Sequence, residues 1–277
     1  MFSIIIPTYN NLNYFKICIE SINKNSLYDH EIIIHINDGS DGTKKYVDSK
    51  NLRYTITKTN VGLCTGINLA ANLATTKYIL YSHDDMYFCP KWDDILLKEI
   101  NKFDHENFYL SGTMIQKTNG HIDLDCGNTS EDFDENKFLN NYKSHNLYNH
   151  QGSHFAPHIV TKKIWNTVKG FSEEFNPGIA SDPDFNMKLW MNGIRVFKGI
   201  NEFKVYHFSS VTTRKKKNFT QNKGEITFLR KWGFSTKFFK KHYLRSKTEY
   251  KGPLKEPIKN LSYYFDLLIC KLKLLFI

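Results

Sequence analysis

The sequence predicts an α/β protein whose mostly parallel central sheet carries helices on both faces. Two observations predict this fold. Short apolar segments of strand length alternate with helical segments along the first half of the chain, which is the order of a parallel sheet. Two of these strands end in acidic turns, at Asp38 and at Asp84-Asp85. In open α/β sheets, ligands bind beyond the carboxyl ends of the strands.

The first half supplies the clearest elements. Residues 2–7 form an apolar, β-branched run closed by Pro7, which predicts a buried strand. Leu12, Phe15, Ile19 and Ile22 follow at helical spacing and predict an amphipathic helix over residues 11–25. Further strands are predicted at residues 31–36, 53–58 and 78–82, and further helices at residues 66–74 and 92–103.

The second half is less regular. Residues 108–115 predict a strand, and residues 123–149 are rich in Asn, Asp, Lys and Tyr, which favours a loop with short elements. Residues 185–191 predict a helix that stops at Asn192-Gly193, and short strands are predicted at residues 195–198 and 204–208. A boundary near residue 210 follows mainly from a step in charge.

The net charge of +10 is unevenly distributed over the 277 residues. Residues 211–277 contain 17 basic and 4 acidic residues, whereas residues 1–210 contain 21 basic and 24 acidic residues. This asymmetry predicts a basic, aromatic helical extension that meets an anionic surface, either a membrane or nucleic acid. A solvated helical tail is the simpler alternative. The apolar residues 263–277 are too short to span a bilayer, but they suit either an interface position or packing against the domain.

Composition excludes several classes of protein. Hydrophobic residues make up 40% and charged residues 24%, as in folded, soluble proteins. No apolar run reaches the roughly 18–20 residues that cross a bilayer, and residues 1–10 do not resemble a signal peptide. The five cysteines include no C-x-x-C pair. We therefore expect a reducing, cytoplasmic location, with contact at a membrane face as an option.

The acidic turn after residues 78–82 suits a divalent cation. Asp84 and Asp85 repel each other unless a positive group lies beside them, and Mg²⁺ or Mn²⁺ is the usual solution. His83 and His207 are candidates to join an Mn²⁺ site. A helix cap or turn is the alternative for any such pair. Neither a G-x-G-x-x-G nor a P-loop motif is present, which disfavours those nucleotide-binding classes.

A second acidic motif, Asp182-Pro183-Asp184, opens the helix predicted at residues 185–191. An aspartate near a helix N-terminus is stabilised by the helix dipole, so a capping role explains this motif when it is taken alone. The functional alternative is a general base that removes the proton of a substrate hydroxyl.

Seven short motifs follow one another along residues 1–210. Three lie before residue 70: S-I-I-I-P-T-Y-N at residues 3–10, N-D-G-S-D-G-T at 37–43, and N-V-G at 60–62, which leads into the helix with Asn68. Four follow: H-D-D at 83–85, G-F-S-E-E-F at 170–175, D-P-D-F at 182–185 and V-Y-H at 205–207. In this order and spacing they resemble an inverting family 2 glycosyltransferase of the GT-A fold, with H-D-D in the place of the D-x-D metal motif.

The resemblance implies a role for each motif. It implies a donor-binding half at residues 1–100, an acceptor half at residues 101–210, and transfer from a UDP- or dTDP-sugar with Mn²⁺ or Mg²⁺. Asp182 is implied as the catalytic base, and Asp85, His207 and His83 as metal ligands. The implied donor-binding residues are Pro7, Thr8, Tyr9, Asn10, Asp38, Asn60, Gly62, Asn68 and Asp84. The implied acceptor-side residues are Trp165, Glu174 and Asp184.

Two departures from the family pattern leave alternatives open. His83 replaces the first aspartate of D-x-D, and Ser181 stands where the family usually has glutamate. Asp184, Glu173 and Glu174 remain rival bases, and Trp165 suits a core position as well as a sugar platform. A sugar nucleotidyltransferase and a non-catalytic protein that binds glycan, membrane or nucleic acid remain alternative functions. The expected acceptor is a glycan, a lipid-linked molecule or a protein, with no specific nucleic acid as partner.

Overall fold

The computed structural model describes residues 1–127, 129–145, 147–208 and 222–277. Its first half follows the predicted order, with β1 (Phe2–Tyr9), α1 (Leu12–Asn25), β2 (Glu31–Asn37), α2 (Thr43–Ser49) and β3 (Arg53–Thr57). The chain continues through α3 (Leu63–Ala71), β4 (Tyr78–Tyr81), β5 (Met86–Phe88) and α4 (Trp92–Ile100). In this half of the chain, helix α2 and strand β5 are elements that the sequence pattern did not predict.

The second half completes the same sheet. It contains β6 (Phe108–Gln116), β7 (Ile122–Asp123), α5 (Glu135–Asn141), β8 (His150–Gln151), β9 (His158–Thr161) and α6 (Lys162–Thr167). A short 3-10 helix, η1 (Glu173–Phe175), precedes α7 (Ser181–Met191) and β10 (Val196–His207). The two strands predicted at 195–198 and 204–208 are one strand, because β10 absorbs a register shift between Gly199 and Lys204 against β6.

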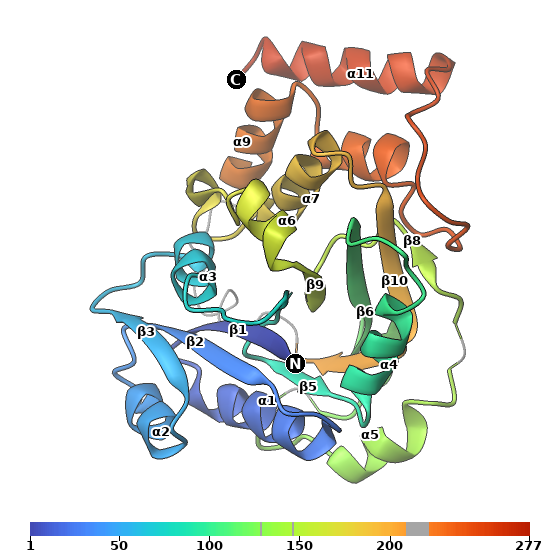
Figure 1. Ribbon diagram of the computed structural model, residues 1–277. Helices are drawn as coiled ribbons and strands as arrows, with labels where there is room; N and C mark the ends of the chain where they lie inside the picture. Colours follow the sequence, from blue (N-terminus) through green and yellow to red (C-terminus); the bar gives the residue numbers. More distant parts are fainter. Residues whose placement is uncertain (128, 146, 209–221) are drawn as a thin grey trace.

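The strand order is β3-β2-β1-β4-β9-β6-β10-β5. Strands β3, β2, β1 and β4 are mutually parallel, and β10 is parallel to β6, whereas β9 and β5 run antiparallel to their neighbours. Helices α1 and α2 lie on one side of β1–β3 and α3 lies on the other (Figure 1). The predicted α/β fold with a mostly parallel sheet is therefore confirmed.

The strands are apolar because both faces of the sheet are covered. Every residue of β1 from Phe2 to Thr8 is buried, and β2 is buried from Ile32 to Asn37. Trp92, at the start of α4, is fully buried against Phe88 and Phe203, with ring centroids 4.9 and 5.9 Å away. This packing fixes the strand ends that carry the polar residues.

The described part of the basic extension packs on the rest of the molecule. It comprises α9 (Asn222–Trp232), α10 (Thr236–Phe238), a π-helix called η2 (Phe239–Tyr243) and α11 (Leu261–Leu274). Lys231 of α9 forms ion pairs with Glu174 and Asp184. The boundary predicted near residue 210 and the basic run at residues 214–217 lie outside the described residues. Among the helices that the structure describes, none combines the length and apolarity required to cross a bilayer.

Candidate active site

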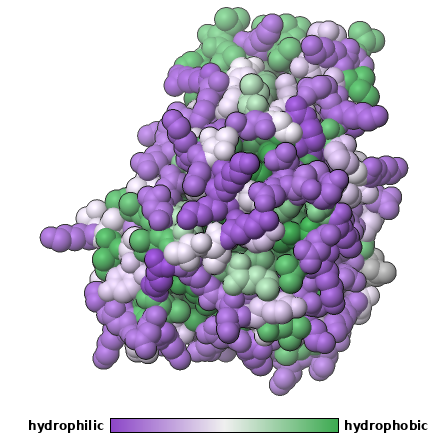
Figure 2. Space-filling view, in the orientation of Figure 1, coloured by the Kyte–Doolittle hydropathy of each residue, from purple (hydrophilic) through white to green (hydrophobic). Residues whose placement is uncertain are grey.

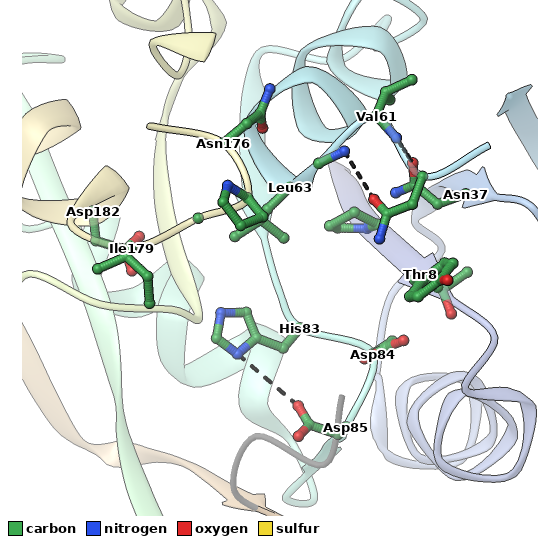
Figure 3. A pocket seen from close by; sticks show the side chains of 16 residues that line it. Thr8, Asn37, Val61, Leu63, His83, Asp84, Asp85, Asn176, Ile179 and Asp182 are labelled. Atoms are coloured by element: carbon green, nitrogen blue, oxygen red, sulfur yellow. Dashed lines mark hydrogen bonds and ion pairs between the residues drawn. The ribbon is translucent and has the colours of Figure 1, made fainter. Parts of the chain in front are cut away.

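A cavity of about 510 Å³ opens at the carboxyl ends of β1, β2 and β4. The segment before α3 and the segment between η1 and α7 close it from the other side. Thr8 and Asn37 lie at one end of the cavity, and Asp182 lies at the other, beyond His83 (Figure 3). Its lining residues are Pro7, Thr8, Tyr9, Asn37, Asn60, Val61, Gly62, Leu63, His83, Asp84, Asp85, Asn176, Pro177, Gly178, Ile179 and Asp182.

The loop before α3 is held by side-chain amides. Val61 donates its backbone N–H to the Asn37 Oδ1 atom at 3.0 Å, and Gly62 donates to Asn60 Oδ1 at 2.8 Å (Figure 3). Gly62 has a φ of 92°, and a Cβ there would overlap the side chain of Asn176. Asn176 in turn accepts the Cys64 N–H at 2.9 Å and so satisfies the first turn of α3.

Asp85 lies within a cluster of two histidines. The Oδ1 atom of Asp85 is 3.2 Å from His207 Nε2 and 4.0 Å from His83 Nδ1, and the two rings approach to 3.4 Å. Burial opposes ionisation of Asp85, but His207 and His83 outweigh burial and lower the pKa of Asp85 to about 2. Burial and the neighbouring His207 lower the pKa of His83 to about 4, so this ring is neutral near pH 7.

These three side chains fit a divalent cation. Their ligand atoms all lie within 4.8 Å of one another. One carboxylate with two imidazoles suits Mn²⁺ better than Mg²⁺, because Mg²⁺ strongly prefers oxygen ligands. His207 is further held through its Nδ1 atom, 2.5 Å from the side-chain amide of Gln116 on β6. Such a contact orients the ring and leaves its other nitrogen directed at Asp85.

Asp84 has a different environment from Asp85. It lies at the cavity wall, where Asn11 donates to its Oδ1 atom at 3.2 Å. Burial and the adjacent Asp85 raise the pKa of Asp84 to about 7. The two neighbouring carboxylates therefore differ in charge state: Asp85 is ionised over the whole neutral range, whereas Asp84 binds a proton readily.

Asp182 lies across the cavity from the β1 strand end. Helix α7 begins at Ser181, four residues earlier than predicted, because Pro183 falls in the first turn, where no backbone N–H is needed. The Oδ1 atom of Asp182 is buried and has no hydrogen-bond partner among the described residues. Burial raises the pKa of Asp182 to about 7. A half-buried carboxylate with that pKa is suited to accept a proton at neutral pH.

Asp184, two residues further along α7, is fully buried and fully engaged. Trp232 donates to its Oδ1 atom at 2.9 Å, Lys231 approaches the same atom at 2.9 Å, and Ser172 donates to Oδ2 at 2.6 Å. Asp184 does not line the cavity. Its contacts join α9 to α7 and η1, which makes it a structural residue in this arrangement.

Several other predicted site residues do not line the cavity. Trp165 is buried in the core, with its ring 5.2 Å from that of Phe185. Glu174 is exposed and binds Lys231. Asn68 exchanges two hydrogen bonds with the backbone of Phe171, and Asn10 donates to Asp38 at 3.0 Å. The remaining predicted residues that the cavity brings together are Pro7, Thr8, Tyr9, Asn60, Gly62, His83, Asp84, Asp85 and Asp182.

The sequence pattern missed residues that reach the site from other elements. Asn37, Asn176 and Ile179 line the cavity, and Gln116 supports His207. Asn37 carried a signal, since it opens the N-D-G-S-D-G-T motif directly after the strand predicted at residues 31–36. Asn176 and Gln116 carried none, because their roles depend on tertiary contacts with α3 and β10.

Comparison with known proteins agrees with this geometry. The model of a family described as Glycosyl transferase family 2 matches residues 3–159, which is more than half of the chain. The chain therefore belongs to glycosyltransferase family 2. Its sheet also resembles that of TarS from S. aureus, with a TM-score of 0.56, 17% identity, and coverage of 86% of this chain and 74% of that chain. This likeness confirms the GT-A fold.

Sequence similarity to two polysaccharide synthases covers a larger part of the chain than the family model does. A chondroitin synthase of Escherichia coli is 26% identical over 221 residues, which cover 77% of this chain and 30% of that protein. A hyaluronan synthase of Pasteurella multocida is 26% identical over 224 residues, which cover 77% of this chain and 21% of that protein. The chain thus spans less than a third of the length of these relatives.

Proposed function

We propose that this chain transfers a sugar from a nucleoside-diphosphate donor, most simply a UDP- or dTDP-sugar, to an acceptor hydroxyl with inversion at the anomeric carbon. The observation that carries the proposal is one cavity with Asp85 and its histidines on one side and Asp182 on the other. Solved structures of TarS in complex with UDP and with UDP-GlcNAc are similar to this chain. That similarity supports the choice of donor class.

Different residues of the chain bind the nucleoside and the cation. Pro7, Thr8 and Tyr9 at the end of β1 form the wall for the nucleoside, and Asn60 and Gly62 face them. Asp85, His207 and His83 would hold a divalent cation, Mn²⁺ in preference to Mg²⁺. When bound, the cation neutralises negative charge that develops on the leaving diphosphate. We assign residues 1–100 to the donor half, residues 101–210 to the acceptor half and residues 211–277 to an extension.

Asp182 acts as the general base. It accepts the proton of the acceptor hydroxyl while the oxygen forms a bond to the anomeric carbon. The bond between that carbon and the diphosphate oxygen breaks, and the nucleoside diphosphate leaves with the bonding electrons. One such displacement inverts the anomeric configuration. The acceptor is a glycan, a lipid-linked molecule or a protein; the similarity to chondroitin and hyaluronan synthases favours a glycan.

Calorimetry of the whole chain tests the donor and the metal. We expect UDP or dTDP to bind with Mn²⁺, to bind at least tenfold more weakly with EDTA, and to be preferred over GDP. Asp85→Ala should weaken this Mn²⁺-dependent binding. Asp182→Asn should retain donor affinity and abolish transfer to a glycan acceptor. The control Glu173→Gln changes an exposed carboxylate outside the cavity and should match the wild type.

Two results would contradict the proposal. Absence of binding by all three nucleotides would favour a non-catalytic role. Equal loss of donor affinity in Asp85→Ala and Asp182→Asn would show that Asp85 and Asp182 do not have the separate roles of cation ligand and general base.

A further inference from the structure

Helix α11 is attached to the molecule by one face only. Tyr263 and Cys270 are buried on that face, and the ring of Tyr263 lies 5.0 Å from the ring of Phe238. Ser235 donates its backbone N–H to the Cys270 sulfur at 3.4 Å. Tyr263, Cys270 and the half-buried Leu267 and Leu274 follow helical spacing, so they form one continuous inner stripe.

The opposite face of α11 is apolar and exposed. At 100° per residue, its side chains fall on a single outward stripe that continues just beyond the helix. The two most exposed members are Leu261 at 90% and Phe276 at 86%. We call this surface the outer stripe; its residues are Leu261, Tyr264, Phe265, Leu268, Ile269, Leu272, Leu275 and Phe276. Green apolar atoms gather along the top of Figure 2, where α11 lies in Figure 1. Contiguous apolar surface of this kind marks an interaction site.

Positive charge borders the outer stripe on both sides. Lys271 and Lys273 are exposed and fall on opposite flanks of it. Asp266, the one acidic residue of α11, faces inward and binds Lys241 and His242, each at 2.7 Å. The described residues 222–277 contain 13 basic and 4 acidic residues. The surface around the stripe is therefore complementary to an anionic partner.

We propose that the outer stripe of α11 binds an anionic lipid bilayer and lies in its interfacial region. The apolar side chains enter the acyl boundary, and Lys271 and Lys273 contact the headgroups. The 14 residues of α11 measure about 21 Å, which suits a helix lying on the surface. A second copy of the chain is the poorer occupant, because it would bring two sets of flanking lysines together. If the proposed transferase function holds, this contact keeps the cavity near a lipid-linked or membrane-associated acceptor.

The test is sedimentation of the full chain with vesicles. One set contains phosphatidylcholine with phosphatidylglycerol, and the other contains phosphatidylcholine alone. We expect pelleting with the anionic set. Leu268→Gln with Leu272→Gln should weaken it by roughly tenfold or more, because two exposed apolar side chains are lost. Lys271→Gln with Lys273→Gln should weaken it by about fivefold per lysine and remove the preference for anionic vesicles.

Matched controls lie far from α11 in the fold. Leu27→Gln changes a leucine of similar exposure, 56% against 53% for Leu268. Lys45→Gln with Lys50→Gln changes two exposed lysines near α2. Both controls should pellet as the wild type does, and circular dichroism should be unchanged in every variant. UDP binding should also be unchanged, so failure of the membrane contact and failure of the transferase function are distinguishable.

Three results would overturn the proposal. The first is absence of pelleting with anionic vesicles. The second is equal pelleting of the Leu268→Gln, Leu272→Gln variant and the Leu27→Gln control. The third is a dimer, seen by analytical ultracentrifugation, that depends on Leu268 and Leu272 and forms without lipid binding; it would assign the outer stripe to a second copy of the chain.

Discussion

Two aspartates on the first turn of α7 should respond to the same substitution with opposite signs. Asp182 has a buried Oδ1 atom without a hydrogen-bond partner among the described residues. Asp184 accepts hydrogen bonds from Trp232 and Ser172 and forms an ion pair with Lys231. Replacement by asparagine removes one negative charge in each case and keeps the shape. We expect Asp182→Asn to stabilise the fold at alkaline pH and Asp184→Asn to destabilise it.

The expected change in the free energy of unfolding for Asp182→Asn follows from the pKa of Asp182, which is about 7 in the folded protein against 3.8 for an unperturbed aspartate. Below about pH 4 both states bind the proton, so Asp182 adds no pH dependence there. As pH rises toward 7, the unfolded state loses its proton first, and the fold loses stability by up to about 1.4 kcal/mol per pH unit. Between about pH 5 and pH 8 the limit is about 3 kcal/mol; because solvent in the cavity screens the half-buried group, we expect about 1–2 kcal/mol.

The expected loss in the free energy of unfolding for Asp184→Asn follows from the contacts of Asp184. Asparagine at this position would leave Lys231 with Glu174 as its remaining partner charge. It would also put a neutral amide in place of the buried carboxylate that accepts from Trp232 and Ser172. Loss of a charged hydrogen bond of this kind costs about 1–3 kcal/mol.

Urea unfolding at about pH 5 and about pH 8 measures both effects. The free energy of unfolding of Asp182→Asn relative to the wild type should rise by about 1–2 kcal/mol between the two values, whereas Asp184→Asn should be less stable at both. An Asp182→Asn curve that runs parallel to the wild type across this range would refute the raised pKa, and with it the physical basis for a base at this position.

Three further predictions concern the site, and a fourth concerns the packing of α9. Transfer should increase as pH rises through about 7, because Asp182 must lose its proton before it accepts another; a profile of kcat/KM against pH checks this. His207→Ala should remove most of the Mn²⁺-dependent gain in UDP affinity, and Gln116→Leu should reduce Mn²⁺ affinity by about tenfold, as calorimetry with and without EDTA would show. Gly224→Ala should lower the free energy of unfolding by about 1–3 kcal/mol, because the methyl group of the alanine would overlap the backbone carbonyl oxygen of Ile179. Thermal unfolding measures that loss.

Local sequence was sufficient to predict that polar residues meet at the carboxyl ends of β1 and β4. Asp84 and Asp85 follow β4, and the carboxyl ends of parallel strands meet at one edge, so the strand pattern predicts that they lie beside the end of β1. Pro7 and Thr8 lie within the end of β1 and were implied by the family resemblance. Asp182 was predicted on weaker grounds, because the motif taken alone favoured a capping role and only the family resemblance implied a catalytic base. In the structure the buried Oδ1 atom of Asp182 has no hydrogen-bond partner among the described residues, which supports the proposal of a base at this position.

Tertiary contacts distinguish residues that the local sequence cannot distinguish. Asp182 and Asp184 share a helix turn and a residue type, and nothing local distinguishes them. The difference arises because α9, 40 residues or more further along the chain, supplies Lys231 and Trp232 to Asp184 and not to Asp182. Similarly, Asn176 reaches the first turn of α3 across more than 100 residues. Periodicity describes one element at a time and carries no information about such partners.

The three cavity aspartates illustrate how environment assigns roles to identical side chains. Asp85 sits between two histidines, and its pKa of about 2 keeps it charged at any physiological pH, as a ligand for a cation requires. Asp84 and Asp182 each have a pKa raised to about 7, but from different sources: Asp84 is next to a charged carboxylate, whereas Asp182 is raised by burial alone. A positive charge at the Asp85 cluster would lower the pKa of the adjacent Asp84 strongly and affect Asp182 less. This difference supports the proposal that Asp182 accepts the proton near neutral pH, while Asp84 and Asp85, which follow β4, stabilise charge.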